Sequence, residues 1–336
     1  MRLAALDYGT VTTRLLVADV TSSRIHQLLK KTLITHLGEG LADSGSISAA
    51  AMLRVISASR EYLKDIENLE QQYKDSEQAI ERAPSEASEI PIQAVATSAM
   101  RDALNSSILI AALAELGIPV QVIAGEREAT LSFSGTLSGF AAQQIQGQSI
   151  LVLDIGGGST ELTLGYVDKT SDRVQLLKSD SFDIGARRVT DRWLRSDPPT
   201  EQELLSARQW IAAELASWFS ELNARGERID QIIAVAGTAT TLVSIREQMT
   251  VYDPAAVHGQ QVSQGQLVQI IQKLSLLDNA ERCKVVGLEA GRAPVVVGGM
   301  LILDEVLRLA NLNAITVSET DILQGIILDA WQQLSC

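Results

Sequence analysis

The chain has 336 residues, 46% of them hydrophobic, and a formal net charge of −13 at pH 7. This length and composition suffice for two hydrophobic cores, and the acidic balance disfavours a protein that binds nucleic acid. The two cysteines, Cys283 and Cys336, have neither metal-ligand spacing nor the pattern of a disulfide framework. The N-terminus does not resemble a signal peptide and no apolar run is long enough to span a bilayer, so we expect a cytoplasmic protein without a membrane partner.

The first predicted element is a hairpin over residues 3–17. An apolar run ends in Asp7-Tyr-Gly9, passes through small hydroxyl residues and continues as a second apolar run, which is the pattern of a strand, a tight turn and a return strand. Apolar residues at helical spacing then predict a helix over residues 48–70. The stretch over residues 71–90 holds many charges and a proline, and we expect it to be an exposed polar insertion.

Further along the chain, strands alternate with helices, and this alternation predicts an α/β fold. We expect strands over residues 92–97 and 120–123, and a second hairpin over residues 151–164. The apolar helix at 294–310 leaves two interpretations open, a homodimer interface and a core between domains. The expected helices cover residues 106–116, 126–139, 201–225, 264–278, 294–310 and 320–331.

The two hairpins are near-copies of each other. Asp7 and Asp154 each end an apolar run, are each followed by a glycine two positions later, and lie far apart in the chain. Residues 93–105 and 233–244 form a second similar pair, and each predicts a strand, a short polar turn and the start of a helix. The duplication indicates two similar α/β domains.

Both hairpin turns have the chemistry of a phosphate cradle. Glycine and small hydroxyl residues let backbone N–H groups approach an anion closely, and an aspartate at the strand end can hold a divalent cation. Asp154 and Glu161 lie at opposite ends of the glycine-rich turn, so a hairpin brings both carboxylates to one phosphate site, with magnesium as their shared partner. The predicted phosphate contacts are Gly9, Thr10, Thr12 and Thr13 in the first hairpin, Gly156, Gly157, Gly158, Ser159 and Thr160 in the second, and the helix start at Gly237 and Thr238.

Eight blocks in order make the chain resemble the exopolyphosphatase/guanosine pentaphosphatase (Ppx/GppA) phosphatase family, in its short two-domain form. A single Asp-x-Gly hairpin is weak evidence, whereas eight blocks along nearly the whole chain are strong. The blocks are Asp7-x-Gly9 through Arg14, Leu37-Gly-Glu-Gly-Leu41, Ala96-Thr-Ser-Ala-x-Arg101-Asp-Ala, Gly125-Glu-x-Glu128-Ala, Asp154-Ile-Gly-Gly-Gly-Ser-Thr-Glu161-Leu, Ala236-Gly-Thr-x-Thr-Thr241, Tyr252-Asp-Pro-x-x-Val-His258-Gly and Gly287-Leu-x-x-x-Arg292-Ala.

The resemblance implies two ribonuclease-H-like domains of the actin, sugar kinase and heat-shock ATPase superfamily, flanking an interdomain cleft. It also implies hydrolysis of a terminal phosphoanhydride with Mg²⁺ or Mn²⁺, the substrate being inorganic polyphosphate or guanosine pentaphosphate. We expect the first domain over residues 1–134, the second over 135–313, and a C-terminal helix within 314–336 that packs back on the first domain. Longer family members carry a further C-terminal helical domain for which this chain has no room, so shorter polyphosphates become candidate substrates.

The resemblance also implies roles for single residues. Glu128 matches the family's catalytic glutamate and is expected to act on the attacking water. Arg14 and Arg101 match basic positions near the cleft and are expected to contact phosphate, Arg101 at the catalytic centre. His258 matches a family position at which a structural hydrogen bond is the leading interpretation. The expected metal ligands are Asp7, Asp154 and Glu161, and Glu161 also has a catalytic role.

Several points leave the substrate and the function open. Arg187 and Arg188 either extend a basic track for a long substrate or are ordinary surface residues. Val11, His36 and Arg127 stand where the family usually has an asparagine, an arginine and an acid. Two alternatives to hydrolysis therefore remain open. One is an ATP-dependent phosphotransferase of the same superfamily, and the other is a sensor that binds a guanosine tetra- or pentaphosphate alarmone with little turnover.

Overall fold

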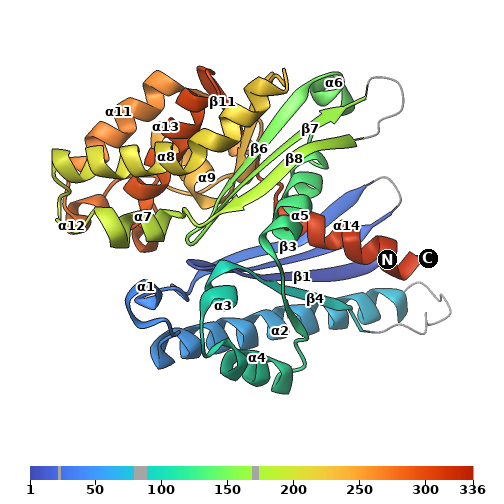
Figure 1. Ribbon diagram of the computed structural model, residues 1–336. Helices are drawn as coiled ribbons and strands as arrows, with labels where there is room; N and C mark the ends of the chain where they lie inside the picture. Colours follow the sequence, from blue (N-terminus) through green and yellow to red (C-terminus); the bar gives the residue numbers. More distant parts are fainter. Residues whose placement is uncertain (22–23, 79–88, 169–173, 336) are drawn as a thin grey trace. The chain divides into compact units, whose positions relative to one another are not determined.

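The computed structural model describes residues 1–21, 24–78, 89–168 and 174–335, and the chain forms two compact units (Figure 1). Unit 1 comprises residues 1–123 and 323–336, and unit 2 comprises residues 124–322. The chain therefore passes between the units after Ile123 and after Ile322, and not after residues 134 and 313 as expected from the sequence. The expected C-terminal helix does belong to the first unit.

Unit 1 is built on a five-stranded mixed sheet in the order β3-β2-β1-β4-β5. The predicted hairpin is formed by β1 and β2, and β3 extends it as a third antiparallel strand. β4 and β5 then run parallel to β1. The strands are β1 (Arg2–Tyr8), β2 (Thr12–Val20), β3 (Ile25–Ile34), β4 (Ile92–Ala96) and β5 (Val120–Val122).

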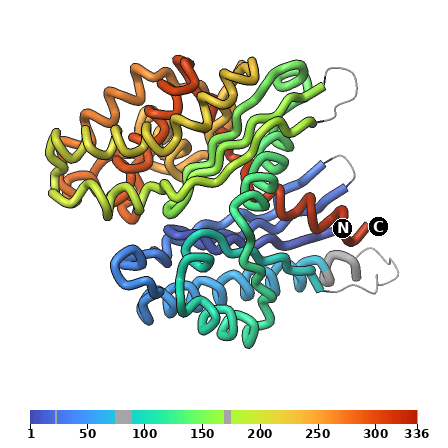
Figure 2. The backbone as a smooth tube through the Cα atoms, viewed as in Figure 1, coloured from blue at the N-terminus to red at the C-terminus, as the bar shows by residue number. Residues whose placement is uncertain are grey.

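The helices of unit 1 complete its core. The long helix α2 packs on β2 and on α4 on one face of the sheet. It continues through residues 71–78 of the expected insertion, whose residues 79–88 lie outside the described part of the chain. Figure 2 shows the N-terminal strands and the C-terminal helix α14, at opposite ends of the colour bar, within this unit. The helices are α1 (Leu41–Ser44), α2 (Ala49–Gln78), α3 (Ser98–Asp102), α4 (Ser106–Glu115) and α14 (Ile322–Ser335).

Unit 2 repeats the same sheet with one strand added. Its order is β10-β11-β9-β6-β7-β8, in which β6, β7 and β8 form the antiparallel part and β9 and β11 run parallel to β6. Both units thus have the ribonuclease-H-like strand order that the resemblance implied. The strands are β6 (Ser149–Ile155), β7 (Thr160–Val167), β8 (Val174–Phe182), β9 (Gln231–Val235), β10 (Gln261–Ser263) and β11 (Ala314–Val317).

Helices cover both faces of this second sheet. The helix α5 packs on β6, β7 and β8, whereas α9 and α13 pack on β6 from the other face, with α7, α8 and α11 against α13. The larger helices are α5 (Gly125–Leu137), α7 (Ala186–Trp193), α8 (Glu201–Ala224), α9 (Ala236–Arg246), α11 (Gln264–Ser275) and α13 (Val296–Leu309). Short helical segments are α6 (Ala142–Ile145), α10 (Pro254–Val257), α12 (Asn279–Arg282) and a 3₁₀ turn at Ala290–Arg292.

Alternation along β6 decides which side chains face α5. Ile150 and Val152 belong to the apolar cluster that includes Phe133 of α5, whereas Leu151 and Leu153 belong to the larger cluster on the opposite face. Each buried side chain of this size contributes about 1.5–3 kcal/mol to folding, so the sheet is held from both faces. Because strand side chains alternate, Asp154 lies on the same face as Val152 and therefore under α5.

The apolar helix predicted at 294–310 is α13. The sequence left open whether it forms a homodimer interface or a core between domains. Twelve residues from Val296 to Leu307 are buried, and α7, α8, α9 and α11 surround the helix. Its apolar length is therefore explained by the core of unit 2.

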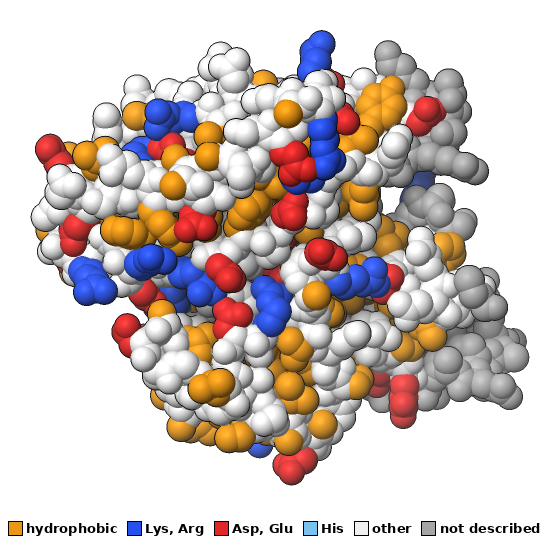
Figure 3. Space-filling model, in the orientation of Figure 1, with side chains coloured by type: hydrophobic (Ala, Val, Ile, Leu, Met, Phe, Trp, Pro, Cys, Tyr) orange, Lys and Arg blue, Asp and Glu red, His pale blue; other side chains and the backbone are white. Residues whose placement is uncertain are grey.

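On the face shown in Figure 3, acidic and basic side chains are interspersed. In the described residues, no helix combines the length and the apolar character that crossing a membrane requires.

A pair of glycines tests how tightly unit 2 is packed. Gly287 has φ of +88° and a Cβ added there would lie 2.2 Å from the Ser244 carbonyl oxygen, whereas Gly259 has φ of +78° and its Cβ would meet no atom within 4 Å. We expect Gly287→Ala to lower the free energy of unfolding by about 3 kcal/mol, from backbone strain and overpacking together, and Gly259→Ala by about 1 kcal/mol from strain alone. Urea unfolding followed by tryptophan fluorescence measures both, and equal losses would contradict this packing.

Candidate active site

Two buried carboxylates face each other in the second hairpin. Asp154 on β6 is the direct cross-strand partner of Glu161 on β7. Their exposed fractions are 6% and 2%. Directly opposed strand residues have Cβ atoms about 4.5–5.5 Å apart, a distance at which like charges destabilise a sheet. The hairpin therefore brings together the two carboxylates that the sequence predicted as partners.

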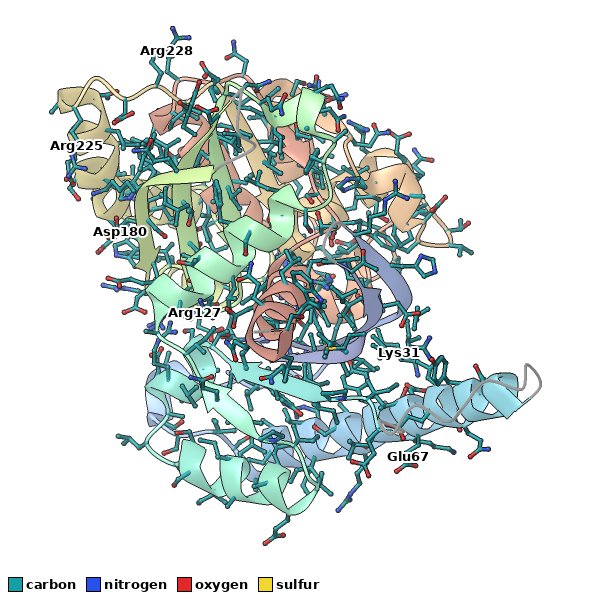
Figure 4. The ribbon with its side chains drawn as sticks, turned by 90° about the vertical axis from the view of Figure 1, so that its right-hand side faces the viewer. Lys31, Glu67, Arg127, Asp180, Arg225 and Arg228 are labelled. Carbon is teal, nitrogen blue, oxygen red and sulfur yellow. The ribbon has the colours of Figure 1, made fainter. Side chains whose placement is uncertain are left out.

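A third carboxylate comes from the first turn of α5. Glu128 is buried, with 8% of its surface exposed, whereas Glu126 and Arg127 are less buried, and Figure 4 labels Arg127 on this helix. The helix begins at Gly125, where an added Cβ would lie 2.4 Å from the Ser181 Cβ. The missing side chain thus lets the start of α5 approach β8 closely, which brings Glu128 over the sheet.

Two serines that were not predicted hold the carboxylates in place. The Ser132 hydroxyl donates to Asp154 Oδ2 at 2.6 Å, and the Ser181 hydroxyl donates to Glu161 Oε1 at 2.7 Å. Ser132 lies four residues after Glu128, so helical spacing places both on one face of α5 and could have indicated it. Ser181 is the cross-strand partner of Glu161 on β8, a pairing that only the register of the sheet reveals.

Burial and repulsion change the acidity of this group. Burial is the largest cause that raises the pKa of Glu161 well above its ordinary value, followed by the negative charges of Glu128 and Asp154. Hydrogen bonds from Ser181 and Ser159 oppose the increase. Because the three carboxylates repel one another in a poorly solvated place, a proton or a cation stabilises them.

The carboxylates were predicted to hold a divalent cation. Among the residues that the structure describes, no group of three or more His, Cys, Asp or Glu side chains is arranged to hold a metal ion by itself. Magnesium commonly binds through one or two carboxylates and completes its shell with water and phosphate oxygens. The opposed oxygen ligands of Asp154 and Glu161 fit this second mode.

The glycine loop Gly156–Gly158 connects the two carboxylate strands, and its carbonyl groups point toward α7. The Gly156 carbonyl accepts from the Ala186 N–H at 2.9 Å, and the Gly157 carbonyl accepts from the N–H groups of Arg187 and Arg188 at 2.9 and 3.2 Å. No hydrogen bond between described residues uses the N–H groups of Gly157 and Gly158. Those two donors are available to an anion.

The hydroxyl residues of the loop divide into two kinds. The Thr160 hydroxyl donates to the Ile184 carbonyl and therefore supports the loop from behind. Ser159 is buried and hydrogen-bonds toward Glu161, which places it beside the carboxylates. Of these two predicted phosphate contacts, only Ser159 has its hydroxyl at the carboxylate group.

The second predicted turn of unit 2 lies at the start of α9. Gly237 lies under the guanidinium of Arg292, where an added Cβ would lie 1.6 Å from Nη1. Thr238 is buried against α13, and its hydroxyl oxygen lies 2.5 Å from the position that a Cβ at Gly299 would take. The turn thus combines a helix start with a basic side chain, although the sequence assigned no role to Arg292.

In unit 1 the corresponding hairpin holds opposite charges. Asp7 on β1 is the cross-strand partner of Arg14 on β2, the same spacing as Asp154 and Glu161. The Arg14 Nε and Nη2 atoms both donate to Asp7 Oδ2, at 2.8 and 2.6 Å. The predicted metal ligand and the predicted phosphate ligand of this hairpin therefore bind each other.

The threonines of the first hairpin point to different sides. The Thr13 hydroxyl hydrogen-bonds to the Thr35 hydroxyl at 3.1 Å inside unit 1, so it supports the sheet. Thr12 lies on the opposite face, which it shares with Arg14 because of strand alternation. The Gly9 N–H donates to the Thr12 carbonyl and closes the turn. The Thr10 side chain packs against Gly38, where an added Cβ would lie 2.3 Å from the Thr10 methyl group.

The remaining candidates make structural contacts. Arg101, at the end of α3, donates from Nη1 to the Ile123 carbonyl at 3.0 Å. The His258 ring bonds through Nε2 to the Gly139 carbonyl at 3.0 Å and accepts the Glu319 N–H at Nδ1. His258 thus makes the structural hydrogen bond considered from the sequence.

Comparisons with known proteins show the family of this chain. The model of the Ppx/GppA phosphatase family matches residues 16–334. The chain is 33% identical to Exopolyphosphatase 2 of Mycobacterium tuberculosis over 97% of this chain and 98% of that protein. It is 30% identical to Exopolyphosphatase 1 of Mycobacterium bovis over 98% of this chain and 88% of that protein.

Solved structures show the same architecture. An exopolyphosphatase from Cytophaga hutchinsonii superposes with a TM-score of 0.81 and 27% identity, covering 99% of this chain and 98% of that one. The Ppx/GppA family member of Aquifex aeolicus has a TM-score of 0.76 at 24% identity, covering 100% and 99%, and shows the fold. The expected α/β fold with two ribonuclease-H-like units is confirmed.

The raised pKa of Glu161 predicts how stability depends on pH without metal. The folded protein binds this proton more tightly than the unfolded chain, so wild-type stability falls as the pH rises from the ordinary value of 4.5 through the raised pKa. Glu161→Gln lacks this loss, and each tenfold difference in proton affinity amounts to about 1.4 kcal/mol.

We therefore expect Glu161→Gln, in the presence of chelator, to be more stable than wild type at pH 7 and about equally stable below pH 4.5. Urea unfolding across this pH range measures the difference, with Glu126→Gln, outside the buried carboxylate group, as the matched control. A stability difference that does not change with pH would show that Glu161 is not a strained carboxylate.

Proposed function

The chain belongs to the Ppx/GppA phosphatase family, and from this we propose that it is an exopolyphosphatase that releases the terminal phosphate of inorganic polyphosphate. We include guanosine pentaphosphate as a second substrate, because it presents the same terminal anhydride. The observation that carries the proposal is the group formed by Glu128, Asp154 and Glu161 beside a glycine loop with two available N–H donors.

The proposed mechanism begins with binding of the terminal phosphate. The N–H groups of Gly157 and Gly158 donate to its oxygens, and the Ser159 hydroxyl adds a polar contact beside them. Fixed donors of this kind stabilise the charge that develops on the transferred group. In unit 1, Arg14 and Arg101 remain the proposed phosphate-contacting arginines.

Glu128 is the proposed general base. Its carboxylate takes a proton from the attacking water, and the oxygen of that water bonds to the terminal phosphorus while the anhydride bond breaks. Its place in the first turn of α5, over Asp154 and Glu161, keeps the carboxylate near the other two acids.

Asp154 and Glu161 are the proposed ligands of Mg²⁺ or Mn²⁺, and Asp7 is the further candidate of unit 1. A divalent cation there would neutralise charge on the transferred and leaving phosphates. Ser132 and Ser181 hold the two carboxylates in fixed orientations, so the oxygen ligands are arranged before substrate binds. We place the reaction in the cytoplasm, the compartment that the dispersed cysteines favour.

A substitution at Glu128 tests the proposal. We expect Glu128→Gln to lower phosphate release from medium-length polyphosphate by about 10²–10⁴-fold with little change in KM, because it removes the base and keeps the shape. Glu126→Gln, two positions earlier and outside the buried group, is the matched control and keeps wild-type activity. Release of phosphate is measured with added Mg²⁺ and with chelator.

The same assay separates the competing functions. Folded wild-type protein that binds guanosine pentaphosphate without releasing phosphate would favour the alarmone sensor. Turnover of ATP only with a small acceptor would favour the phosphotransferase. Equal activity of Glu128→Gln and wild type would contradict the proposed role of this carboxylate.

A further inference from the structure

Arg188 of α7 binds a carbonyl group of the glycine loop with its side chain, as the backbone of α7 does with the two preceding carbonyls. Arg188 is the third residue of α7, and its Nε donates to the Gly158 carbonyl at 2.9 Å. Its Nη2 lies 3.5 Å from the exposed Asp183 carboxylate, which holds the outer end of the guanidinium. The side chain is 30% exposed, so this contact is partly shielded from water.

Three successive carbonyl groups of the loop are therefore bound from one side. Backbone N–H groups of α7 bind the carbonyls of Gly156 and Gly157, and the Arg188 side chain binds that of Gly158. A carbonyl and the N–H group of the same peptide point in opposite directions. Holding the Gly157 carbonyl toward α7 therefore turns the Gly158 N–H away from α7, and holding the Gly156 carbonyl does the same for the Gly157 N–H.

The fit between the loop and α7 is too close for any side chain at the helix start. A Cβ added at Gly185, the residue before α7, would lie 2.3 Å from the Gly157 carbonyl oxygen and 2.4 Å from the Gly158 nitrogen. Behind α7, a Cβ added at Gly298 of α13 would lie 2.6 Å from the Ala186 carbonyl oxygen. The helix that binds the loop is thus itself held from the core of unit 2.

We propose that Arg188 is a positioning residue whose Nε–H holds the Gly158 carbonyl toward α7, so that the N–H group of the same peptide, that of Ser159, stays directed away from α7 and the loop keeps its N–H groups available to the terminal phosphate. The inference rests on the proposed function and adds a residue to it. Arg188 then acts through its hydrogen-bond donor and not by extending a basic track for the substrate. The alternative, an electrostatic contact to phosphate, depends on charge alone.

Three substitutions separate the donor from the charge. Glutamine carries an amide nitrogen the same number of bonds from Cα as arginine Nε, so Arg188→Gln keeps a donor there and loses the charge. Lysine has a methylene at that position and its ammonium one bond further, so Arg188→Lys keeps the charge and loses the donor. Arg188→Met removes both. Arg228→Met is the matched control, since Arg228 is 83% exposed and projects outward in Figure 4.

We expect kcat for polyphosphate to fall by about tenfold or more in Arg188→Lys and Arg188→Met, with KM changed less, because loss of a charge-assisted hydrogen bond frees the loop. Arg188→Gln regains most of that loss. A second readout needs no turnover: deuterium exchange of the N–H groups at residues 186–188, which bind the loop carbonyls. Exchange rises in the Lys and Met variants and stays near the wild-type rate in Arg188→Gln and Arg228→Met.

The opposite ranking overturns the inference. If Arg188→Lys keeps kcat while Arg188→Gln and Arg188→Met both raise KM, Arg188 binds substrate by its charge. Unchanged exchange in all variants also overturns it. If the wild-type protein releases no phosphate but the exchange ranking holds, the proposed function fails and the positioning role stands. Should Arg188→Met not fold, as judged by tryptophan fluorescence, the Gln and Lys variants still decide the question.

Discussion

The structure of unit 2 depends on a pair of like charges that a stable hairpin avoids. Asp154 and Glu161 are direct cross-strand partners, both buried, and Glu128 adds a third negative charge from α5. Water cannot solvate these groups well, and the serine hydroxyls of α5 and β8 hold two of them. Burial first, and then the negative charges of Glu128 and Asp154, raise the pKa of Glu161. An arrangement in which buried carboxylates repel one another would be stabilised by a cation, which is why we propose that one binds there.

The two similar hairpins, one in each unit, carry different charges at the same position. The hairpins of the two units have the same register, yet the position opposite the aspartate is arginine in unit 1 and glutamate in unit 2. Arg14 neutralises Asp7 through two hydrogen bonds, so the opposed pair of that hairpin carries no like-charge repulsion. The second hairpin keeps its repulsion and carries the glycine loop. One scaffold therefore serves as an ion-paired sheet in one unit and as the candidate reaction centre in the other.

Much of the fold could be predicted because strand alternation and the repeated Asp-x-Gly turn are local signals. The boundaries could not, since α5 has no composition that distinguishes a helix of the first unit from one that packs on β8 of the second. The carboxylates were found from hairpin geometry and from the family block at Glu128. Ser181 was missed because it depends on the register of β8, and the inward turn of Thr13 depends on a neighbour at Thr35 that lies far along the sequence.

The central claim is that the strained carboxylates of unit 2 are where the cation binds. Crystals grown with Mn²⁺ and a short polyphosphate, examined by anomalous scattering at the manganese edge, test it directly. The account predicts a manganese peak about 2 Å from a carboxylate oxygen of Asp154 or Glu161, with phosphate oxygens completing its shell. A peak bound instead to Asp7, with Arg14 displaced, or no manganese at the glycine loop, would contradict it.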